Sequence, residues 1–403
     1  MGLTVQLYKP HDKQLEIHNA LENDCKYTLV SIGRQFGKTV MGENQATKWA
    51  LENKWLIAWI SPTYKQCKKV FKDFRRALDG LDIYSKKPNE SDLIIYFTSG
   101  SELRFYSAEA YDSIRGETFD AAVGDEMAFW KREAWTEVIK ATLLVKGKKF
   151  LGLSTPKGKN LFYELCQQHN VNSDYQFFKG TSYDNPYVNP EEIEDARRTL
   201  PDHVFRQEYL AEFLEDGGSV FVNIKDAIKK GSTSSRCYFG LDLGKANDFT
   251  VLTIVNDRNE EIFCERWRQM EWSKIKSNVV KVLNQYRPTG YIECNGAQDS
   301  IFEDIKRQIN YNQSSIQPFI TTTKTKPIII EDLIVCFEDN SLGIIGKDWQ
   351  IGELEAFTYE YNHKTRKVKY EAPTGLHDDY VMSRAICNHA FRTLKSSGVY
   401  TII

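Results

Sequence analysis

Two sets of residues in this 403-residue chain have the types and spacing that phosphate chemistry requires. The first set begins in a loop with the sequence GRQFGKT at 33–39, between an apolar run and an expected helix. Such a loop offers backbone N–H groups to phosphate, its lysine reaches the β and γ oxygens, and its threonine hydroxyl can hold Mg²⁺. The standard spacing would place the first glycine at Ile32, so this is a variant P-loop, and an ordinary strand-to-helix turn stays open. The residues expected to bind nucleotide here are Gly33, Arg34, Gln35, Gly37, Lys38 and Thr39, with Thr39 also on the metal.

Two acids extend this first set. The apolar run at 121–124 is expected to be a strand, and it ends in Asp125 and Glu126. P-loop ATPases hold Mg²⁺ with such an Asp and polarise the attacking water with the Glu, although the acids could merely cap a helix expected at 131–145. Another apolar run, 150–153, ends in Ser154 and Thr155, whose hydroxyls would lie near the γ-phosphate.

Three polar side chains, Arg34 among them, have additional candidate roles at the nucleotide site. The amide of Gln14 can pair with adenine, and a solvated helix position is the alternative. Arg34 would reach the γ-phosphate of its own subunit from inside the P-loop. Arg115 lies ten residues before Asp125 and would act on the nucleotide of a neighbouring subunit, unless it only forms a surface ion pair.

The second set consists of acids at the ends of apolar segments. Burying an unpaired carboxylate costs several kcal/mol, so an Asp inside an apolar strand needs a cation or dense hydrogen bonding. Asp378 shares a helical face with apolar residues and is expected to point inward, with Asp379 nearer the edge; both could instead be helix caps. Inward acids from several elements are typical of a two-metal Mg²⁺ or Mn²⁺ site that cleaves phosphodiesters, as in RNase H-like nucleases. The expected metal ligands are Asp242, Asp248, Glu293, Asp378 and Asp379.

Two α/β domains are expected to position these residues. From about residue 10 to 215, short apolar runs alternate with helical patterns, which predicts a parallel-rich sheet. Residues 216–236 are rich in Gly, Ser and Lys, so they are predicted to be a linker before a second domain at 237–403. Further predicted elements are strands at 27–32, 55–60, 237–243, 250–256, 261–266 and 291–294, a hairpin at 93–97 and 102–106, and helices at 272–285 and from about 377.

The composition is that of an ordinary globular protein, but its net charge is close to zero. The chain has 53 Lys and Arg against 55 Asp and Glu, so 53 − 55 gives a net charge of −2. Nucleic-acid-binding proteins are usually basic, so any DNA contact must come from local basic patches. The eight cysteines are scattered singly, which indicates reduced thiols and no zinc site. The apolar runs are too short for a membrane span or a signal peptide, so no membrane partner is expected.

Taken together, these motifs resemble the large terminase subunits of tailed double-stranded DNA phages. The matching segments occur in the family's order: SIGRQFGKT (31–39), AAVGDE (121–126), LSTPKG (153–158), FGLDLGKANDFT (239–250), YIECNG (291–296) and HDDYVMS (377–383). The resemblance implies an α/β P-loop packaging ATPase at 1–215, with a lid or linker subdomain at about 157–215, followed by an RNase H-like, RuvC-type nuclease. The Arg-Gln-x-Gly-Lys-Thr form of the P-loop in this family accounts for the displaced glycine.

The resemblance also implies particular residues and partners. ATP and Mg²⁺ would bind at the P-loop, Glu126 would be the catalytic acid/base, and Ser154 and Thr155 would couple hydrolysis to motion. Arg34 or Arg115 would be the arginine finger. Asp242, Glu293 and Asp378 are the matched nuclease ligands, for Mg²⁺ or Mn²⁺, with Asp248 and Asp379 beside them. The implied partners are double-stranded DNA, a small terminase subunit, a portal protein and a pentameric ring of this chain. It would act in the cytoplasm of the infected bacterium, docked transiently on the procapsid and absent from the mature virion.

Other interpretations stay open from the sequence. A helicase–nuclease or resolvase of DNA repair would use the same chemistry, whereas a non-catalytic scaffold is disfavoured because every expected acid and the P-loop lysine are present. Candidate DNA contacts are the basic face of a helix expected at 64–78, for which a solvated face is the alternative, and a hairpin expected at 355–370. Lys324 and Lys326 are weaker candidates.

Overall fold

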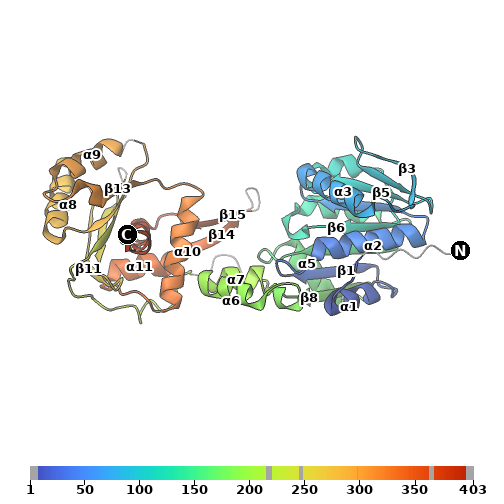
Figure 1. Cartoon of the computed structure of the whole chain (residues 1–403), viewed down its shortest axis with the longest axis horizontal. Helices are drawn as coiled ribbons and strands as arrows, with labels where there is room; N and C mark the ends of the chain where they lie inside the picture. Colours follow the sequence, from blue (N-terminus) through green and yellow to red (C-terminus); the bar gives the residue numbers. More distant parts are fainter. Residues whose placement is uncertain (1–7, 215–219, 245–247, 297, 363–366, 396–403) are drawn as a thin grey trace, which may run out of the picture. The chain divides into compact units, whose positions relative to one another are not determined.

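The computed structural model describes residues 8–214, 220–244, 248–296, 298–362 and 367–395. The chain divides into two compact units (Figure 1). The first contains Met1–Ala196 and His203–Glu215, and the second contains Arg197–Asp202 and Asp216–Ile403. Among the described residues, no helix is both long enough and apolar enough to cross a bilayer.

The first unit is built on an eight-stranded sheet in the order β3-β4-β5-β2-β6-β7-β1-β8. The two pairings β3–β4 and β4–β5 are antiparallel, and all the others are parallel. Because β6, β7 and β1 are adjacent and parallel, the loops that follow them meet at one edge of the sheet. The strands are β1 (Tyr27–Ile32), β2 (Leu56–Ser61), β3 (Tyr84–Asn89), β4 (Ile94–Phe97), β5 (Glu102–Ser107), β6 (Ala121–Gly124), β7 (Lys149–Ser154) and β8 (Tyr175–Gly180).

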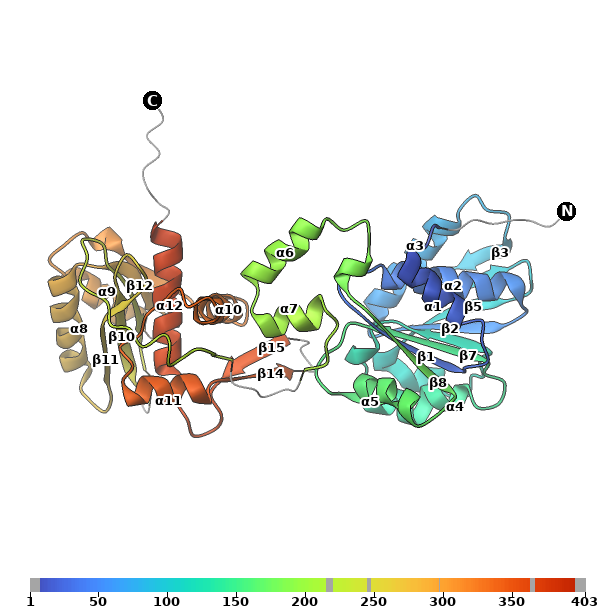
Figure 2. The ribbon, with the colours of Figure 1, turned by 90° about the horizontal axis from the view of Figure 1, so that it is seen from below.

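Helices cover both faces of this sheet, since its central strands are apolar on both sides. In β1, Val30 and Ile32 pack into the core on the side of α2 and α3, whereas Tyr27 and Leu29 pack on the opposite side. Figure 2 shows α1, α2 and α3 on one face and α5 on the other. The helices are α1 (Asp12–Ala20), α2 (Lys38–Glu52), α3 (Tyr64–Leu78), α4 (Lys140–Thr142) and α5 (Leu161–Gln167). Helices α6 (Pro190–Thr199) and α7 (Asp202–Glu208) follow in the chain, and the last three residues of α6 and the first of α7 belong to the second unit.

The second unit contains a five-stranded sheet in the order β11-β10-β9-β12-β13. Strand β10 runs antiparallel to β9 and β11, and β9, β12 and β13 are parallel to one another. Because β9 and β12 are parallel neighbours, the acids that end them lie at the same sheet edge. The strands are β9 (Tyr238–Asp242), β10 (Thr250–Val255), β11 (Glu261–Trp267), β12 (Thr289–Glu293) and β13 (Ile316–Phe319), and a separate hairpin is formed by β14 (Thr358–Asn362) and β15 (Lys367–Glu371).

The C-terminal helix α12 packs directly across β9. A Cβ atom on Gly240 would lie 2.3 Å from the backbone oxygen of Ser383, so only glycine allows this close approach. Helices α8 and α9 cover the other face of the sheet, as Figure 2 shows. The helices of this unit are α8 (Trp272–Tyr286), α9 (Asp299–Gln308), α10 (Thr325–Glu338), α11 (Asp348–Ala356) and α12 (Asp379–Lys395).

Three sequence expectations differ from the structure. The regular helix expected at 131–145 is a π-helix at Ala134–Ile139 followed by the single turn α4. The expected linker 216–236 belongs to the second unit where it is described, because Val220, Phe221 and Ile224 are buried in its core. Part of the expected lid at 157–215 is the edge strand β8, which pairs with β1 and is therefore integral to the sheet.

Candidate nucleotide and metal sites

The P-loop joins β1 to α2 with the backbone shape that phosphate binding requires. Gly37 has φ 94° and caps α2, whose first N–H groups donate no hydrogen bond to a capping side chain. They are therefore available to an anion at the positive end of the helix. A Cβ atom on Gly33 would lie 2.4 Å from the backbone oxygen of Tyr209, so glycine is needed there for close packing.

The lysine and the two acids of the first set meet, as the sequence predicts. Lys38 Nζ lies 2.9 Å from a carboxylate oxygen of Glu126, and Asp125 is buried beside it. Burial and the charge of Glu126 raise the pKa of Asp125 to about 7. Within the described residues, Asp125 Oδ1 and Glu126 Oε2 are buried without a hydrogen-bond partner. Two unsatisfied carboxylate oxygens beside a P-loop fit a divalent cation.

Ser154, the last residue of β7, contacts the segment that follows Asp125 and Glu126. Ser154 Oγ accepts a hydrogen bond from the backbone N–H of Ala128 at 3.1 Å and donates one to the backbone oxygen of Thr155 at 2.8 Å. Both side chains are buried. This contact joins the strand end at 154 to the segment that begins two residues after Glu126.

Gln14 is buried against the P-loop, so the alternative of a solvated helix position is wrong. Its Oε1 accepts a hydrogen bond from the backbone N–H of His11 at 3.1 Å, and its Nε2 donates to the backbone oxygen of Gly37 at 3.2 Å. The amide therefore supports the loop, and adenine recognition by Gln14 stays a prediction.

The two candidate arginine fingers have different surroundings. Arg34 Nε donates to Glu208 Oε2 at 2.6 Å, inside the nucleotide site. Arg115 is exposed and pairs with Asp112 at 2.7 Å and Glu137 at 3.2 Å, the surface ion pairs that were its alternative. The assignment of either residue as the arginine finger stays a prediction.

The five acids of the second set all line one cavity of about 190 Å³. Asp242, Glu293 and Asp379 are buried, whereas Asp378 is partly exposed and Asp248 is exposed. The prediction that Asp378 is the more buried of the two acids is therefore wrong, because α12 begins at Asp379 and Asp378 precedes the helix. Asp379 Oδ2 accepts a hydrogen bond from the backbone N–H of Phe249 at 3.2 Å.

The electrostatics of this cavity favour a cation. Burial, a hydrogen bond with Glu293 and the neighbouring negative charges hold the pKa of Asp242 well above its usual range. Burial is also the main cause that raises the pKa of Asp379 to about 6. Within the described residues, no three acid, histidine or cysteine side chains are yet arranged as a metal cage. The acids converge on one cavity, and a bound cation would draw them closer.

Several site residues escaped the sequence analysis. Asn295 Nδ2 donates to Glu293 Oε1 at 2.9 Å and so orients that acid. Lys326, named in the sequence only as a weak DNA contact, donates from Nζ to Asp378 Oδ2 at 3.0 Å. In the first unit, Lys157 and Glu208 pair with each other beside the P-loop. The position of Lys157 directly after Ser-Thr-Pro was a usable signal, whereas nothing near Glu208 in the sequence points to the site.

Divalent metal should stabilise the second unit, and more strongly at higher pH. Asp379 ionises near 3.8 in the unfolded chain and at about 6 in the folded one, so metal-free stability falls as the pH rises between these values. Metal binding needs the ionised acids, so its contribution grows over the same range. At 100 times its Kd, Mn²⁺ should add about 2.7 kcal/mol to the free energy of unfolding.

Thermal unfolding of the full chain with Mn²⁺ or with a chelator, at about pH 5.5 and about pH 8, measures this effect. The variant Asp242→Asn is the control and should lose the metal-dependent shift. A shift that is equal at both pH values, or that persists in Asp242→Asn, would contradict the assignment of this cavity.

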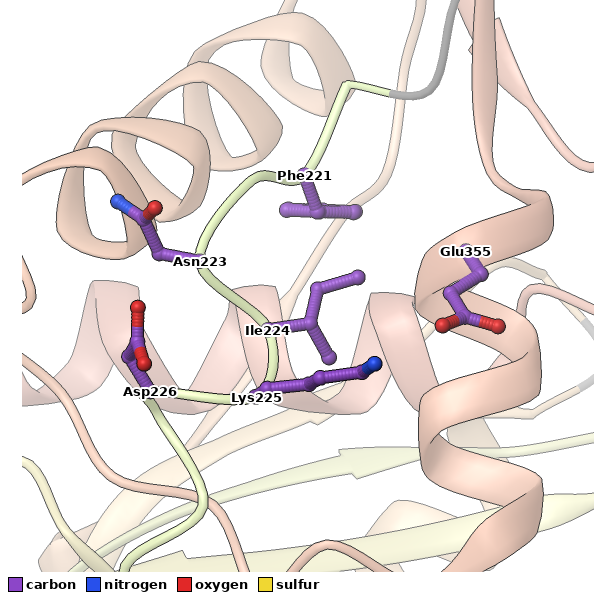
Figure 3. A pocket seen from close by; sticks show the side chains of 6 residues that line it. All are labelled: Phe221, Asn223, Ile224, Lys225, Asp226 and Glu355. Atoms are coloured by element: carbon purple, nitrogen blue, oxygen red, sulfur yellow. The ribbon is translucent and has the colours of Figure 1, made fainter.

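A second hollow in the same unit, of about 490 Å³, contains none of the expected site residues. Figure 3 shows Phe221 and Ile224 on its wall and Lys225 extending toward the side where Glu355 lies. Its lining also includes Asn223 and Asp226. This lining combines apolar side chains with charges of both signs, unlike the P-loop and the cavity of five acids, and we assign it no function.

Comparisons with known proteins agree with this geometry. The family described as "Terminase large subunit, T4likevirus-type, N-terminal" matches residues 29–225. The large terminase subunit of Thermus virus P23-45 is 27% identical, over 94% of this chain and 87% of that protein. The large terminase subunit of Escherichia phage T5 is 28% identical, over 61% of this chain and 60% of its own length.

A solved structure gives the same result for the fold. The large terminase of a thermophilic bacteriophage covers 95% of this chain and 99% of its own, with a TM-score of 0.54 and 14% identity. At that identity the likeness concerns the fold alone, and it extends over both units. The family match and the two curated relatives, together with the paired P-loop and acid motifs, point the same way: this chain is similar to the large terminase subunits of phages.

Proposed function

We propose that this chain is the motor and nuclease subunit of a phage DNA-packaging machine. ATP hydrolysis in the first unit drives double-stranded DNA into the procapsid, and a metal-dependent endonuclease in the second unit cuts concatemeric DNA. The observation that carries the proposal is the presence of two chemically distinct sites in one chain. In the first, a P-loop lysine is paired with Glu126, and in the second, five carboxylates line one cavity.

In the ATPase site, each residue has a task that its position supports. The P-loop amides and Lys38 bind the β- and γ-phosphates, and Thr39 and Asp125 would hold Mg²⁺, which neutralises phosphate charge when bound. Glu126 accepts a proton from the attacking water once the nucleotide has replaced it as the partner of Lys38. The contact from Ser154 to Ala128 carries the resulting change from the site to β7.

In the nuclease site, Asp242, Glu293, Asp378 and Asp379 would hold divalent cations, with Asp248 at the rim. Two such cations, when bound, stabilise the attacking and leaving oxygens of the phosphodiester. Asn295 keeps Glu293 oriented, and the hydrogen bond from Phe249 fixes Asp379. The mixed sheet, with acids at the ends of β9 and β12, supports the RNase H-like, RuvC-type assignment.

The ligands of a related protein support a nucleotide. The large terminase of the thermophilic bacteriophage compared above has also been solved with ADP and with ATP-γ-S, in structures 14% and 12% identical to this chain. For this chain we propose ATP with Mg²⁺ in the first unit, and Mg²⁺ or Mn²⁺ in the second. The part of 157–215 outside β8 is proposed as the lid.

DNA contacts and partners complete the proposal. Helix α3 is amphipathic, with Val70, Phe71 and Phe74 buried and its lysines and arginines elsewhere on its surface. The β14–β15 hairpin is a second candidate, and the expected contacts Lys364 and Arg366 lie outside the described residues. By family, the further partners are a small terminase subunit, a portal protein and a pentameric ring. The place of action is the cytoplasm of the infected bacterium, with transient docking on the procapsid and no place in the mature virion.

A DNase-protection experiment tests the proposal. Procapsids, portal and DNA of the cognate phage are mixed with this chain and either ATP or ATP-γ-S. ATP should give DNA that is protected inside capsids, and ATP-γ-S should give essentially none, because translocation needs turnover. A chain that hydrolyses ATP and cuts DNA, yet neither docks on the portal nor protects any DNA, would favour the repair enzyme instead.

A further inference from the structure

Glu208, the last residue of α7, contacts both the P-loop and Lys157, which directly follows the segment 154–156. Its backbone oxygen accepts a hydrogen bond from the backbone N–H of Arg34 at 2.7 Å. Its carboxylate accepts from Arg34 Nε at 2.6 Å through one oxygen and from Lys157 Nζ through the other. The side chains of Glu208 and Lys157 are 9% and 10% exposed, so this ion pair is almost entirely removed from water.

The residues beside Glu208 are packed tightly against the same loop. The backbone oxygen of Tyr209 accepts from the N–H of Ser182 at 2.8 Å, and Ser182 Oγ donates to the backbone oxygen of Arg34 at 2.7 Å. Tyr209 is also the residue whose oxygen leaves no room for a side chain at Gly33. The end of α7 and the P-loop therefore cannot move independently while these contacts last.

The cations around Glu208 exceed what one carboxylate can neutralise. Burial, together with the positive charges of Arg34 and Lys38, lowers the pKa of Lys157 to about 8, whereas the charge of Glu126 raises it. Lys157 therefore shares the electrostatic environment of the P-loop lysine. A γ-phosphate in the loop would bring several charged acceptor oxygens into this environment, and charge-assisted hydrogen bonds to them are strong.

We propose that Lys157 is a further phosphate-binding residue of the ATPase site, and that Glu208 is a positioning residue that holds Lys157 and Arg34 until a γ-phosphate replaces it. This rests on the proposed ATPase function. In the triphosphate state the two cations turn to the nucleotide and the carboxylate of Glu208 is released, which loosens α7 from the P-loop. After hydrolysis and loss of phosphate, the ion pairs with Glu208 form again.

Binding of two nucleotides to the full chain tests the first half of the proposal. Affinities for ATP-γ-S and for ADP, each with Mg²⁺, are measured by calorimetry in wild type and in Lys157→Met. The variant should bind ATP-γ-S about tenfold more weakly and ADP within about twofold of wild type, because only the triphosphate offers Lys157 its partner. Lys157→Arg keeps the charge and should largely restore the preference for ATP-γ-S.

The second half of the proposal is tested at Glu208. Glu208→Gln removes the competing charge and should bind ATP-γ-S about threefold to tenfold more tightly, with ADP unchanged. Glu208→Asp should return toward wild type. Glu212→Gln is the matched control, since Glu212 pairs with Arg206 at 2.7 Å on the same segment, and it should change neither affinity.

Hydrogen exchange of the wild-type chain provides a readout that does not depend on a variant's folding. Amides at 203–214 should exchange faster with ATP-γ-S than with ADP. Two results together would show that the Lys157–Glu208 pair is only structural. In the first, Lys157→Met weakens the affinity for both nucleotides equally or for neither. In the second, the amides at 203–214 exchange at the same rate with ATP-γ-S as with ADP. A wild-type chain that binds neither nucleotide would overturn the ATPase assignment itself, which is a different result.

Discussion

The variant Glu126→Gln should lose ATP turnover by about 10²-fold to 10⁴-fold, the usual contribution of general acid–base catalysis. Glutamine has nearly the same shape and can still accept a hydrogen bond from Lys38, which lies 2.9 Å from the carboxylate in the wild type. It cannot take a proton from water. Nucleotide binding should therefore persist while turnover stops, and metal-dependent DNA cleavage should stay within about twofold of wild type, since only one proton acceptor has changed.

Steady-state phosphate release and cleavage of plasmid DNA, measured on the same preparation, decide this prediction. Glu164→Gln is a matched control in the same unit, because Glu164 is half-exposed and pairs only at the surface with Arg132. It should leave both activities unchanged. Full ATP turnover in Glu126→Gln would require another proton acceptor and would remove Glu126 from the mechanism.

The sequence predicts much of the fold, because burial leaves a clear local pattern there. Strand β6 is a continuous apolar run, and its predicted bounds, 121–124, agree with Ala121–Gly124. The predicted helix 64–78 agrees with Tyr64–Leu78, since buried residues recur at helical spacing at Cys67, Val70, Phe71, Phe74 and Leu78. Asp242 and Glu293 were predictable for a related reason, because an acid late in an apolar strand is costly without a cation.

Other features depend on information that a local pattern lacks. Asp378 was predicted to be the more buried of the two acids, and this was wrong because α12 begins at Asp379 and not at about 377, so Asp378 precedes the helix and the helical-face argument does not apply to it. The pair of Lys157 and Glu208 joins residues 51 positions apart, and no periodicity links them. The π-helix at Ala134–Ile139 arises where the sequence suggested a regular helix, and packing around Trp135 is not visible in the sequence.

The variant Asp242→Asn should abolish DNA cleavage and spare ATP hydrolysis. Changing even an outer residue that orients a metal ligand usually lowers metal affinity or activity by up to about 100-fold, so loss of a ligand itself should lower cleavage by at least that factor. The same change should not destabilise the metal-free unit. Because the pKa of Asp242 is well above its usual range, the folded chain holds a proton that the unfolded chain releases, and stability falls as the pH rises. Asparagine carries no such proton, so the variant should unfold at a higher temperature than wild type at alkaline pH.

Asp304→Asn is the matched control for this result, because Asp304 lies in the same unit and pairs with Lys276 at 2.6 Å, away from the cavity. It should cut DNA like the wild type. Cleavage that survives in Asp242→Asn would place the nuclease site elsewhere. Loss of both activities in both Glu126→Gln and Asp242→Asn, with the fold intact, would contradict the division into two sites. That division is the reason to expect opposite losses, because the residues that would bind nucleotide all lie in the first unit and the acids that would cut DNA all lie in the second.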